Sequence, residues 1–264
     1  MRHRVTAIAM MLVLAGATSQ PARDEPPMYA CARAVGAINV DGALDDVAWK
    51  SAPWTEEFVD IVGSHGKQPP ALRTRAKLLW DGANLYVAAE LTDPRVAATI
   101  RQRDEQLFRE QAFEVFIDPG GEGKDYLELQ INPLNTACDL SMDKPYRDKG
   151  TANVAFNLAG LRSAVRVKGT VNEPSDVDEG WTVELAIPWA ALKALSADTV
   201  APPGGGERWR VNLARMRASE PAQDAGVKVR GDMSVWAAQG AVNMHLPERW
   251  GQVEFAGVSA KHQN

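Results

Sequence analysis

Short segments in which apolar and polar residues alternate constrain the fold of this chain more than any other feature. Residues 112–118 (AFEVFID) have an apolar side chain at every second position, and residues 126–132 (YLELQIN) repeat this pattern. Alternation with a period of two is typical of β-strands that bury one face. Other segments have the same strand character: residues 74–80, 84–91, 163–170, 181–187, 208–215 and 251–255. The sequence therefore predicts an all-β protein.

Signals for helices are short and few. Residues 45–50 follow a turn, and residues 188–195 (PWAALKAL) carry a proline near a helix start. Parallel βαβ units would need longer crossover helices between the strands. The Asp81-Gly82 pair between two strand segments predicts a hairpin turn. We therefore expect a single antiparallel β-sandwich, immunoglobulin/DOMON-like, with short helices.

The N-terminus has the pattern of an export signal. Basic residues at positions 2–4 precede residues 5–17, which are apolar except for a threonine and a glycine, and small residues follow. This run is shorter than the roughly 20 residues that a membrane-spanning helix needs. An uncleaved anchor or a buried helix is the alternative. The sequence predicts a signal peptide at residues 1–22 and a periplasmic or extracellular protein.

One domain follows this signal. Residues 20–29 (QPARDEPPMY) are rich in proline and polar residues, and no comparable linker occurs between residues 31 and 258. We expect a linker or N-terminal extension at residues 23–35 and one β-sandwich domain at residues 36–258, since sandwiches of roughly 200–250 residues often form one domain.

The charge balance argues against a general binder of polyanions. The chain has 29 Lys and Arg against 34 Asp and Glu, a formal net charge of −5. Phosphate contacts need a concentrated basic patch, which this composition does not favour.

The cysteines are Cys31 and Cys138. Because an exported protein matures in an oxidising compartment, a disulfide between them is one hypothesis. Two unlinked, buried thiols are the other. The sequence has no CxxC and no Cys/His cluster, so a zinc site of the usual spacing is not expected.

Motifs for catalysis are missing. The sequence has no GxSxG, no HExxH and no P-loop, and nothing indicates a nucleophile beside His65 or His245. The acids Glu114, Glu128 and Glu184 lie on strand segments, where we expect a polar sheet face. A glycosidase would need two carboxylates at a fixed separation, which a sequence does not give.

Acidic residues also gather at predicted turns and strand ends, namely Asp41, Asp45, Asp46, Asp93 and Asp118. Calcium prefers oxygen ligands supplied by loops, although no EF-hand spacing is present. A structural calcium site is therefore one hypothesis.

Tryptophan is frequent, with eight residues. Four fall on apolar phases and are expected in the core (Trp49, Trp181, Trp189, Trp209), and two are expected to pack at strand ends (Trp80, Trp250). The sequence leaves Trp54 and Trp236 open. An exposed aromatic ring in an exported sandwich often stacks on a sugar.

Seven motifs follow one another along nearly the whole chain after the signal. They are INVDGALDDVAW at 38–49, LLWDGANLYVAAELTDP at 78–94, FEVFIDP at 113–119, YLELQINP at 126–133, GWTVELAIPW at 180–189, WRVNLAR at 209–215 and HLPERWGQVEF at 245–255. In this order they resemble the family 9 carbohydrate-binding modules and the family-9-like domains of exported bacterial proteins. The resemblance implies a distorted antiparallel β-sandwich, calcium sites that support the fold, and binding of a glycan.

The resemblance also implies a binding site. In family 9 modules two aromatic residues clamp a terminal sugar; Phe108 is the nearest match to one, and no tryptophan matches the other. Polar contacts in the family match Glu114, Gln130 and Asn212, which share the polar phase of their strands, and a loop near Asn243. Arg215 falls on an apolar phase, either as a site residue or as a buried structural charge. The expected ligand-binding residues are Phe108, Glu114, Gln130, Asn212, Arg215, Trp236, Asn243 and His245.

The leading hypothesis is therefore a non-catalytic, exported carbohydrate-binding protein whose partner is an oligo- or polysaccharide and which supports polysaccharide breakdown or uptake. A haem-binding electron-transfer sandwich is a second class, with axial ligands from Met142, Met216, Met233, Met244 or His245; the missing CxxCH motif excludes covalent haem. A glycan-cleaving enzyme is a third, for which the chain leaves no room for a catalytic domain. A partner-docking domain with a decayed sugar site is the fourth.

Overall fold

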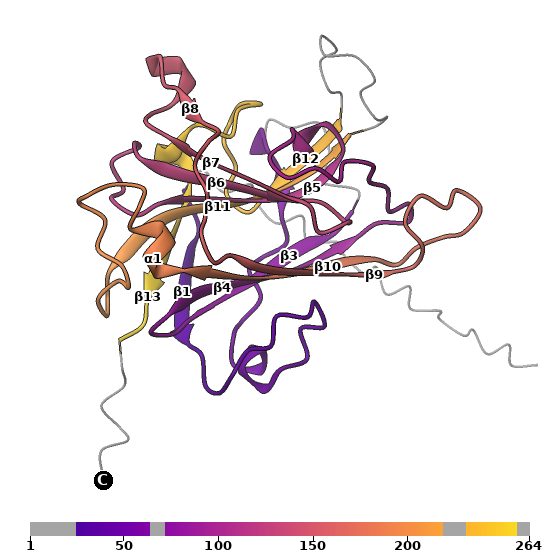
Figure 1. Cartoon of the computed structure of the whole chain (residues 1–264), viewed down its shortest axis with the longest axis horizontal. Helices are drawn as coiled ribbons and strands as arrows, with labels where there is room; N and C mark the ends of the chain where they lie inside the picture. Colours follow the sequence, from indigo (N-terminus) through magenta and orange to yellow (C-terminus); the bar gives the residue numbers. More distant parts are fainter. Residues whose placement is uncertain (1–24, 64–71, 219–230, 258–264) are drawn as a thin grey trace, which may run out of the picture.

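The computed structural model describes residues 25–63, 72–218 and 231–257, and these form a two-layered β structure (Figure 1). One layer has the strand order β8-β7-β6-β5-β11-β13, and the other has the order β3-β4-β10-β9. The first comprises β8 (Ala152–Asn153), β7 (Ala137–Met142), β6 (Tyr126–Ile131), β5 (Gln111–Asp118), β11 (Arg208–Ala218) and β13 (Gly251–Phe255). The second comprises β3 (Thr74–Trp80), β4 (Asn84–Thr92), β10 (Gly180–Pro188) and β9 (Arg162–Lys168).

Strand β1 (Met28–Arg33) joins the two layers, because it pairs with β13 on one side and with β3 on the other. Both pairings are parallel, whereas the other strand pairs of the described residues are antiparallel. The all-β sandwich is confirmed. The expected linker or extension at 23–35 contains β1, so the sandwich begins before residue 36.

Short elements complete the fold. Strand β12 (Gly231–Val235) pairs with β11, and β2 (Val59–Asp60) pairs with β12. The α-helix α1 spans Trp189–Leu192, and 3₁₀ helices lie at Val47–Lys50, Leu107–Arg109, Tyr146–Asp148 and Pro247–Arg249. No helix in the described ranges is long and apolar enough to cross a membrane. The predicted signal peptide lies outside the described residues.

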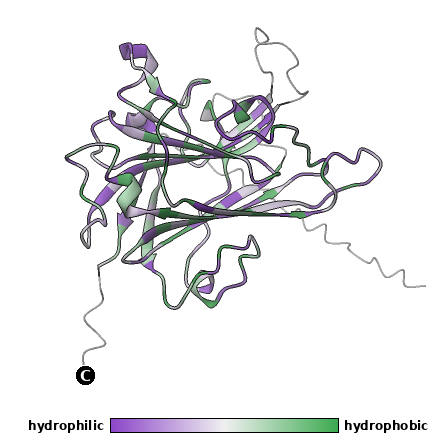
Figure 2. Ribbon diagram, viewed as in Figure 1, coloured by the Kyte–Doolittle hydropathy of each residue, from purple (hydrophilic) through white to green (hydrophobic). Residues whose placement is uncertain are grey.

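The core lies between the layers, where the apolar phases of the strands meet. Phe113, Val115 and Ile117 of β5 pack there together with Leu127, Leu129 and Ile131 of β6. Hydrophobic residues accordingly follow the facing strands in Figure 2, whereas hydrophilic residues colour much of the loops. The phase of each strand therefore fixes which side chains leave the core and are available for a site.

The expected core tryptophans are buried, as are Trp80 and Trp250. Trp236 also belongs to the core between the layers, where its ring lies edge-on to Tyr29 at 6.4 Å. Trp54 stays partly exposed, and the guanidinium of Arg75 lies 4.1 Å from its ring centroid.

The acidic motif at residues 38–49 is held in place by hydrogen bonds to Glu184. The backbone N–H groups of Asp41 and Gly42 each donate to Oε2 of Glu184 at 3.0 Å, and Nε1 of Trp49 donates to its Oε1 at 2.6 Å. Glu184 lies on β10 and is fully buried. The motif thus packs residues 38–49 over the outer face of the second layer.

Both cysteines are free and buried. Cys31 lies in the core between the layers, whereas Cys138 belongs to a separate cluster with Leu107 and Met216. The disulfide hypothesis was wrong, because the two thiols lie in different clusters.

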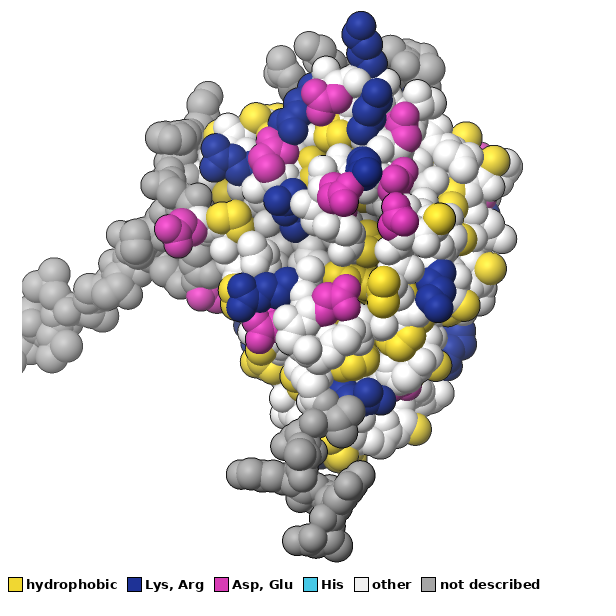
Figure 3. Space-filling model, turned by 90° about the vertical axis from the view of Figure 1, so that its left-hand side faces the viewer, with side chains coloured by type: hydrophobic (Ala, Val, Ile, Leu, Met, Phe, Trp, Pro, Cys, Tyr) yellow, Lys and Arg dark blue, Asp and Glu magenta, His cyan; other side chains and the backbone are white. Residues whose placement is uncertain are grey.

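Charges of both signs mix on the surface. On the face drawn in Figure 3, Lys and Arg side chains are interspersed with Asp and Glu side chains. Exposed ion pairs neutralise each other's charge locally; for example, Nη1 of Arg147 lies 2.5 Å from Oε1 of Glu248. This face offers no continuous basic area for a polyanion, in line with the charge balance of the sequence.

Candidate functional site

A group of polar side chains lies on the outer face of β5 and β6. Glu114 belongs to β5, and Glu128 and Gln130 belong to β6, all on the phase opposite to the core residues of these strands. The antiparallel register places Glu114 opposite Gln130 and Phe116 opposite Glu128. Strand alternation therefore brings two carboxyl groups and one amide together.

Apolar clusters flank this polar group on both sides. One contains Phe116, Tyr126 and Trp250, and the other contains Leu107, Ala112 and Cys138. As a result the three polar side chains are almost completely removed from solvent, with Glu114 and Gln130 each 3% exposed. Buried polar groups of this kind require partners.

Gln130 connects the carboxyl groups to the loop that precedes β5. Its Nε2 donates a hydrogen bond to Oε1 of Glu128 at 2.6 Å, and its Oε1 accepts one from the backbone N–H of Phe108 at 3.1 Å. Phe108 sits in the 3₁₀ helix Leu107–Arg109 and is partly buried. The predicted neighbours Phe108, Glu114 and Gln130 are thus brought together.

His245 borders the same group from the C-terminal part of the chain. Its Nδ1 lies 2.9 Å from the hydroxyl of Tyr126, and its Nε2 lies 3.7 Å from Oε2 of Glu128. The ring of Tyr146 stands edge-on to the imidazole at 4.6 Å. Asn243 supports this position, because its Oδ1 accepts the backbone N–H of His245 at 2.9 Å.

Burial sets the protonation of this site. It raises the pKa of both Glu114 and Glu128, and the negative charge of Glu128 raises the pKa of Glu114 further. A hydrogen bond from Gln130 acts against this rise at Glu128. Burial also lowers the pKa of His245 to about 4, so the imidazole is neutral near pH 7. The site therefore carries less negative charge than its two carboxyl groups would have in water.

One acceptor in the site has no partner. Oε1 of Glu114 is buried and accepts no hydrogen bond from any described residue. An unsatisfied buried polar group costs about 1–3 kcal/mol, and a ligand that donates a hydrogen bond to this atom offsets part of that cost. Hydroxyl groups of a ligand fit such an acceptor.

The raised carboxyl pKa values predict a pH-dependent effect of removing one charge. A group whose pKa is raised by folding stabilises the folded state below its ordinary pKa, here 4.5, and loses this effect as the pH rises through its folded value. We expect Glu114→Gln to raise the melting temperature at about pH 8.5, by roughly 2–4 °C for each 1 kcal/mol of relieved repulsion, and to change it little at about pH 5. Differential scanning calorimetry of both proteins at both pH values measures this.

His245 acts with the opposite sign, since its folded pKa is lowered and its stabilising effect is lost as the pH falls from 6.5 toward 4. It is present in both proteins, so the difference between variant and wild type isolates the glutamate. Equal differences at the two pH values would contradict the assignment.

Asn212 lies on the same outer face, opposite Phe116, but its amide bonds to the backbone of Ala237. Its Nδ2 donates to the carbonyl of Ala237 at 3.0 Å, and its Oδ1 accepts the N–H of Ala237 at 3.0 Å. Asn212 thus fixes the chain after β12 instead of facing the polar group. Trp236, expected as a wall of the site, is a core residue, because the backbone of its neighbour Ala237 is held against β11 and its own ring points between the layers.

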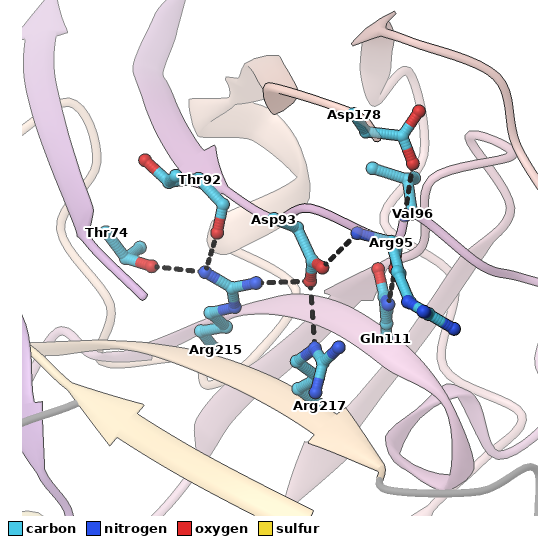
Figure 4. Close-up of polar contacts among 9 residues, drawn as sticks. All are labelled: Thr74, Thr92, Asp93, Arg95, Val96, Gln111, Asp178, Arg215 and Arg217. Carbon is cyan, nitrogen blue, oxygen red and sulfur yellow. Dashed lines mark hydrogen bonds and ion pairs between the residues drawn. The ribbon is translucent and has the colours of Figure 1, made fainter. Parts of the chain in front are cut away.

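Arg215 lies in a separate buried ion cluster (Figure 4). Its Nη2 donates to Oδ2 of Asp93 at 2.5 Å, and its Nη1 donates to the carbonyl of Thr92 at 2.7 Å and to Oγ1 of Thr74 at 3.2 Å. Arg217 Nε lies 3.1 Å from the same carboxylate oxygen. Arg215 therefore links β11 to the ends of β3 and β4. Of the two interpretations that the sequence left open, the buried structural charge is the one the structure supports.

Two of the acids considered for calcium, Asp93 and Asp118, have protein partners. Asp93 pairs with two arginines, and Asp118 accepts the N–H groups of Gly121 and Gly123, both at 2.9 Å. Within the described ranges, no group of three or more His, Cys, Asp or Glu residues is placed to hold a metal ion. Calcium binding stays a prediction.

The candidate haem ligands lie outside the space between the layers. Met142 and Met244 pack in the cluster around Trp250, and Met216 and Met233 pack in or against the cluster around Leu107. Side chains such as Trp181 and Trp209 fill the space between the layers. A haem held between the two sheets would find none of these four methionines there.

Sequence reasoning missed two aromatic residues of the site. Tyr126 shares the phase of Glu128 and Gln130, so the alternation of residues 126–132 contained the signal. Tyr146 comes from the 3₁₀ helix Tyr146–Asp148, which has no periodic pattern, and reaches the site only through its contact with His245.

Comparison with known proteins agrees with this fold. The family described as "Carbohydrate family 9 binding domain-like" matches residues 40–258. An exoglucanase, XynX, from Acetivibrio thermocellus is 24% identical over 182 residues, which cover 69% of this chain and 14% of that protein. Endo-1,4-beta-xylanase C from Paenibacillus barcinonensis is 36% identical over 153 residues, which cover 58% of this chain and 12% of that protein. The aligned part is thus about one-eighth of the length of these relatives.

Solved structures share the architecture. A carbohydrate-binding module of family 9 from Caldicellulosiruptor kristjanssonii, in complex with cellotriose, superimposes with a TM-score of 0.57 at 17% identity, covering 90% of this chain and 97% of that chain. A protein from Bacteroides uniformis gives a TM-score of 0.64 at 12% identity, covering 88% of this chain and all of the other. At these identities the likeness concerns the fold.

Proposed function

The chain belongs to the carbohydrate family 9 binding domain-like family, and from this premise we propose that it binds a glycan, without cleaving it, at the outer face of β5 and β6. The ligand is an oligo- or polysaccharide. Glu114 and Gln130 supply hydrogen-bonding groups, and Phe108, Tyr146 and His245 supply the surrounding rings.

The observation that carries this proposal is the unpartnered, buried Oε1 of Glu114. Sugars offer many hydroxyl donors, and an acceptor already removed from water loses little hydration when a hydroxyl reaches it. Neighbouring aromatic rings favour the apolar faces of a pyranose, by analogy with other stacking contacts worth on the order of 1 kcal/mol. Neutral His245 and a carboxyl pair of reduced charge suit an uncharged sugar unit at this position.

Two further points belong to this proposal. Export to the periplasm or the cell exterior is supported by the N-terminal pattern of the sequence and by relatives named as xylanases. A role in polysaccharide breakdown or uptake follows from the same relatives, two of which are an exoglucanase and an endo-1,4-beta-xylanase.

A glycan-array screen of residues 23–264 tests the proposal, repeated with calcium and with a chelator. We expect saturable binding to at least one class of β-linked oligosaccharide, and no release of shorter products from that ligand over prolonged incubation. Loss of binding with the chelator would support the calcium prediction. No binding by well-folded protein would overturn the glycan proposal and favour a partner-docking domain, while product release would overturn the absence of catalysis.

A further inference from the structure

A cavity of about 320 Å³ opens at the edge of the sandwich, where the two layers approach each other. Its lining includes Arg101 and Arg103 from the loop before β5, Asn135 and Thr136 from the turn between β6 and β7, and Leu161 and Ser163 at β9. Asn135 connects the two layers at this edge, because its Nδ2 donates a hydrogen bond to the carbonyl of Ser163 at 3.1 Å. The cavity is thus built from three segments far apart in the sequence.

The loop that carries the two arginines is firmly held. The carbonyl of Ile100 accepts hydrogen bonds from Nδ2 of Asn132 at 2.7 Å and from Oγ1 of Thr136 at 2.8 Å. The carboxylate of Glu110 accepts the N–H of Thr99 at 2.7 Å and Nδ2 of Asn132 at 2.8 Å. The backbone at Arg101 is therefore positioned by the turn between β6 and β7.

The lining is positive. It contains two arginines and no acidic residue. Arg103 is paired with the buried carboxylate of Asp139, and its Nε lies 3.6 Å from Asp104. Arg101 has no hydrogen bond or ion pair with the side chains of the described residues. One guanidinium at this cavity is therefore free to bind an anion.

The cavity lies at the turn between β6 and β7, at one end of the strands that carry the proposed glycan site. Thr136 lies two residues before Cys138, which stands opposite Gln130 in the register of β6 and β7. At about 3.3 Å per residue, Thr136 lies roughly 7 Å along the chain from Cys138, the neighbour of Gln130, a distance that a short oligosaccharide spans. A chain bound beside Glu114 and Gln130 can thus extend toward Arg101.

We propose that this cavity is a second subsite, which binds a carboxylate-bearing sugar, a uronic acid residue, of the same glycan. This inference rests on the proposed function. The fork of a guanidinium matches a carboxylate in bidentate geometry. Asn135 and Ser163 add polar groups for ring hydroxyls, and Leu161 offers an apolar surface for the ring. The ligand class is therefore an acidic oligosaccharide.

Isothermal titration calorimetry of residues 23–264 tests this with two matched pairs of probes. One pair is cellotriose and its C6-oxidised counterpart, and the other is a xylo-oligosaccharide with and without a glucuronic acid branch. We expect the acidic member of at least one pair to bind about tenfold more tightly, since a charge-assisted contact is worth about 1.4 kcal/mol or more. The preference should shrink with added salt.

Arg101→Gln should abolish the preference and leave the affinity for the neutral member unchanged. Arg162→Gln is the matched control, because Arg162 is an exposed arginine at the start of β9 that does not line the cavity, and it should retain the preference. Equal affinities within both pairs, or a preference that survives Arg101→Gln, would overturn the subsite alone. Failure of all four probes to bind would count against the glycan site itself and remove the subsite with it.

Discussion

Replacing Asp93 with alanine is expected to lower the melting temperature by roughly 10 °C. Asp93 is fully buried and accepts from both Arg215 and Arg217. Removing one partner of a buried pair leaves an uncompensated charge and costs about 3–5 kcal/mol. For a domain of roughly 150–250 residues, each 1 kcal/mol shifts the melting temperature by about 2–4 °C. Calorimetry at neutral pH measures the change.

The cluster joins the two layers, which explains why the effect should be large. Arg215 comes from β11, while its acceptors belong to Asp93, Thr92 and Thr74 at the ends of the other layer. Within the cluster, burial lowers the pKa of Arg215 and Asp93 acts against that shift. Loss of Asp93 therefore leaves the buried guanidinium of Arg215 without its counter-charge at the contact between the two layers.

Two variants control this prediction. Asp198→Ala removes an exposed aspartate and should leave the melting temperature within about 2 °C of wild type, since surface changes rarely exceed about 0.5 kcal/mol. Adding Arg215→Met to Asp93→Ala should recover part of the loss, because the more deeply buried of the two arginines left without Asp93 is then gone. A melting temperature of Asp93→Ala close to that of wild type would show that the cluster does not hold the layers together.

Much of the fold could be predicted because the strands that build it alternate cleanly. The segments at 74–80, 112–118 and 251–255 became β3, β5 and β13 with nearly the same bounds. The strands β1, β2, β7, β8 and β12 were not predicted. Among them, β1 (MYACAR) begins within a proline-rich stretch, and β12 (GDMSV) has no regular alternation. Such strands are stabilised by pairing with neighbouring strands, β13 and β3 for β1 and β11 for β12. The sequence alone does not show which strands are neighbours.

For the candidate site, the alternation along the strands predicted which face of the sheet each residue lies on, but not its hydrogen-bond partners. Phase placed Glu114, Gln130 and Asn212 on one face, and the structure agrees. Phase does not show that the backbone of Ala237 uses the amide of Asn212. Arg215 stood on an apolar phase with two interpretations open, and its partner Asp93 lies 122 residues away in the sequence. Contacts of that range depend on the packing of the layers.

Replacing Glu114 with alanine is expected to weaken binding of the glycan identified in the array screen by roughly tenfold. Because its pKa is raised to about 8, Glu114 is mostly uncharged near pH 7. A hydrogen bond between uncharged groups contributes about 0.5–1.5 kcal/mol, and each 1.4 kcal/mol is a factor of ten. Glu114→Gln keeps one acceptor oxygen and should lose less. Titration calorimetry with the same oligosaccharide measures both variants.

The stability of Glu114→Gln separates loss of binding from loss of fold. Since burial beside Glu128 raises the pKa of Glu114, removing its charge relieves the folded state at alkaline pH. A variant that melts no lower than wild type and still binds less tightly has lost a ligand contact. Glu179→Gln, an exposed glutamate outside the site, should bind as wild type does. If Glu114→Ala bound the glycan with unchanged affinity, the unpartnered oxygen of Glu114 would not face the ligand, and the site would have to be sought on another face of the sandwich.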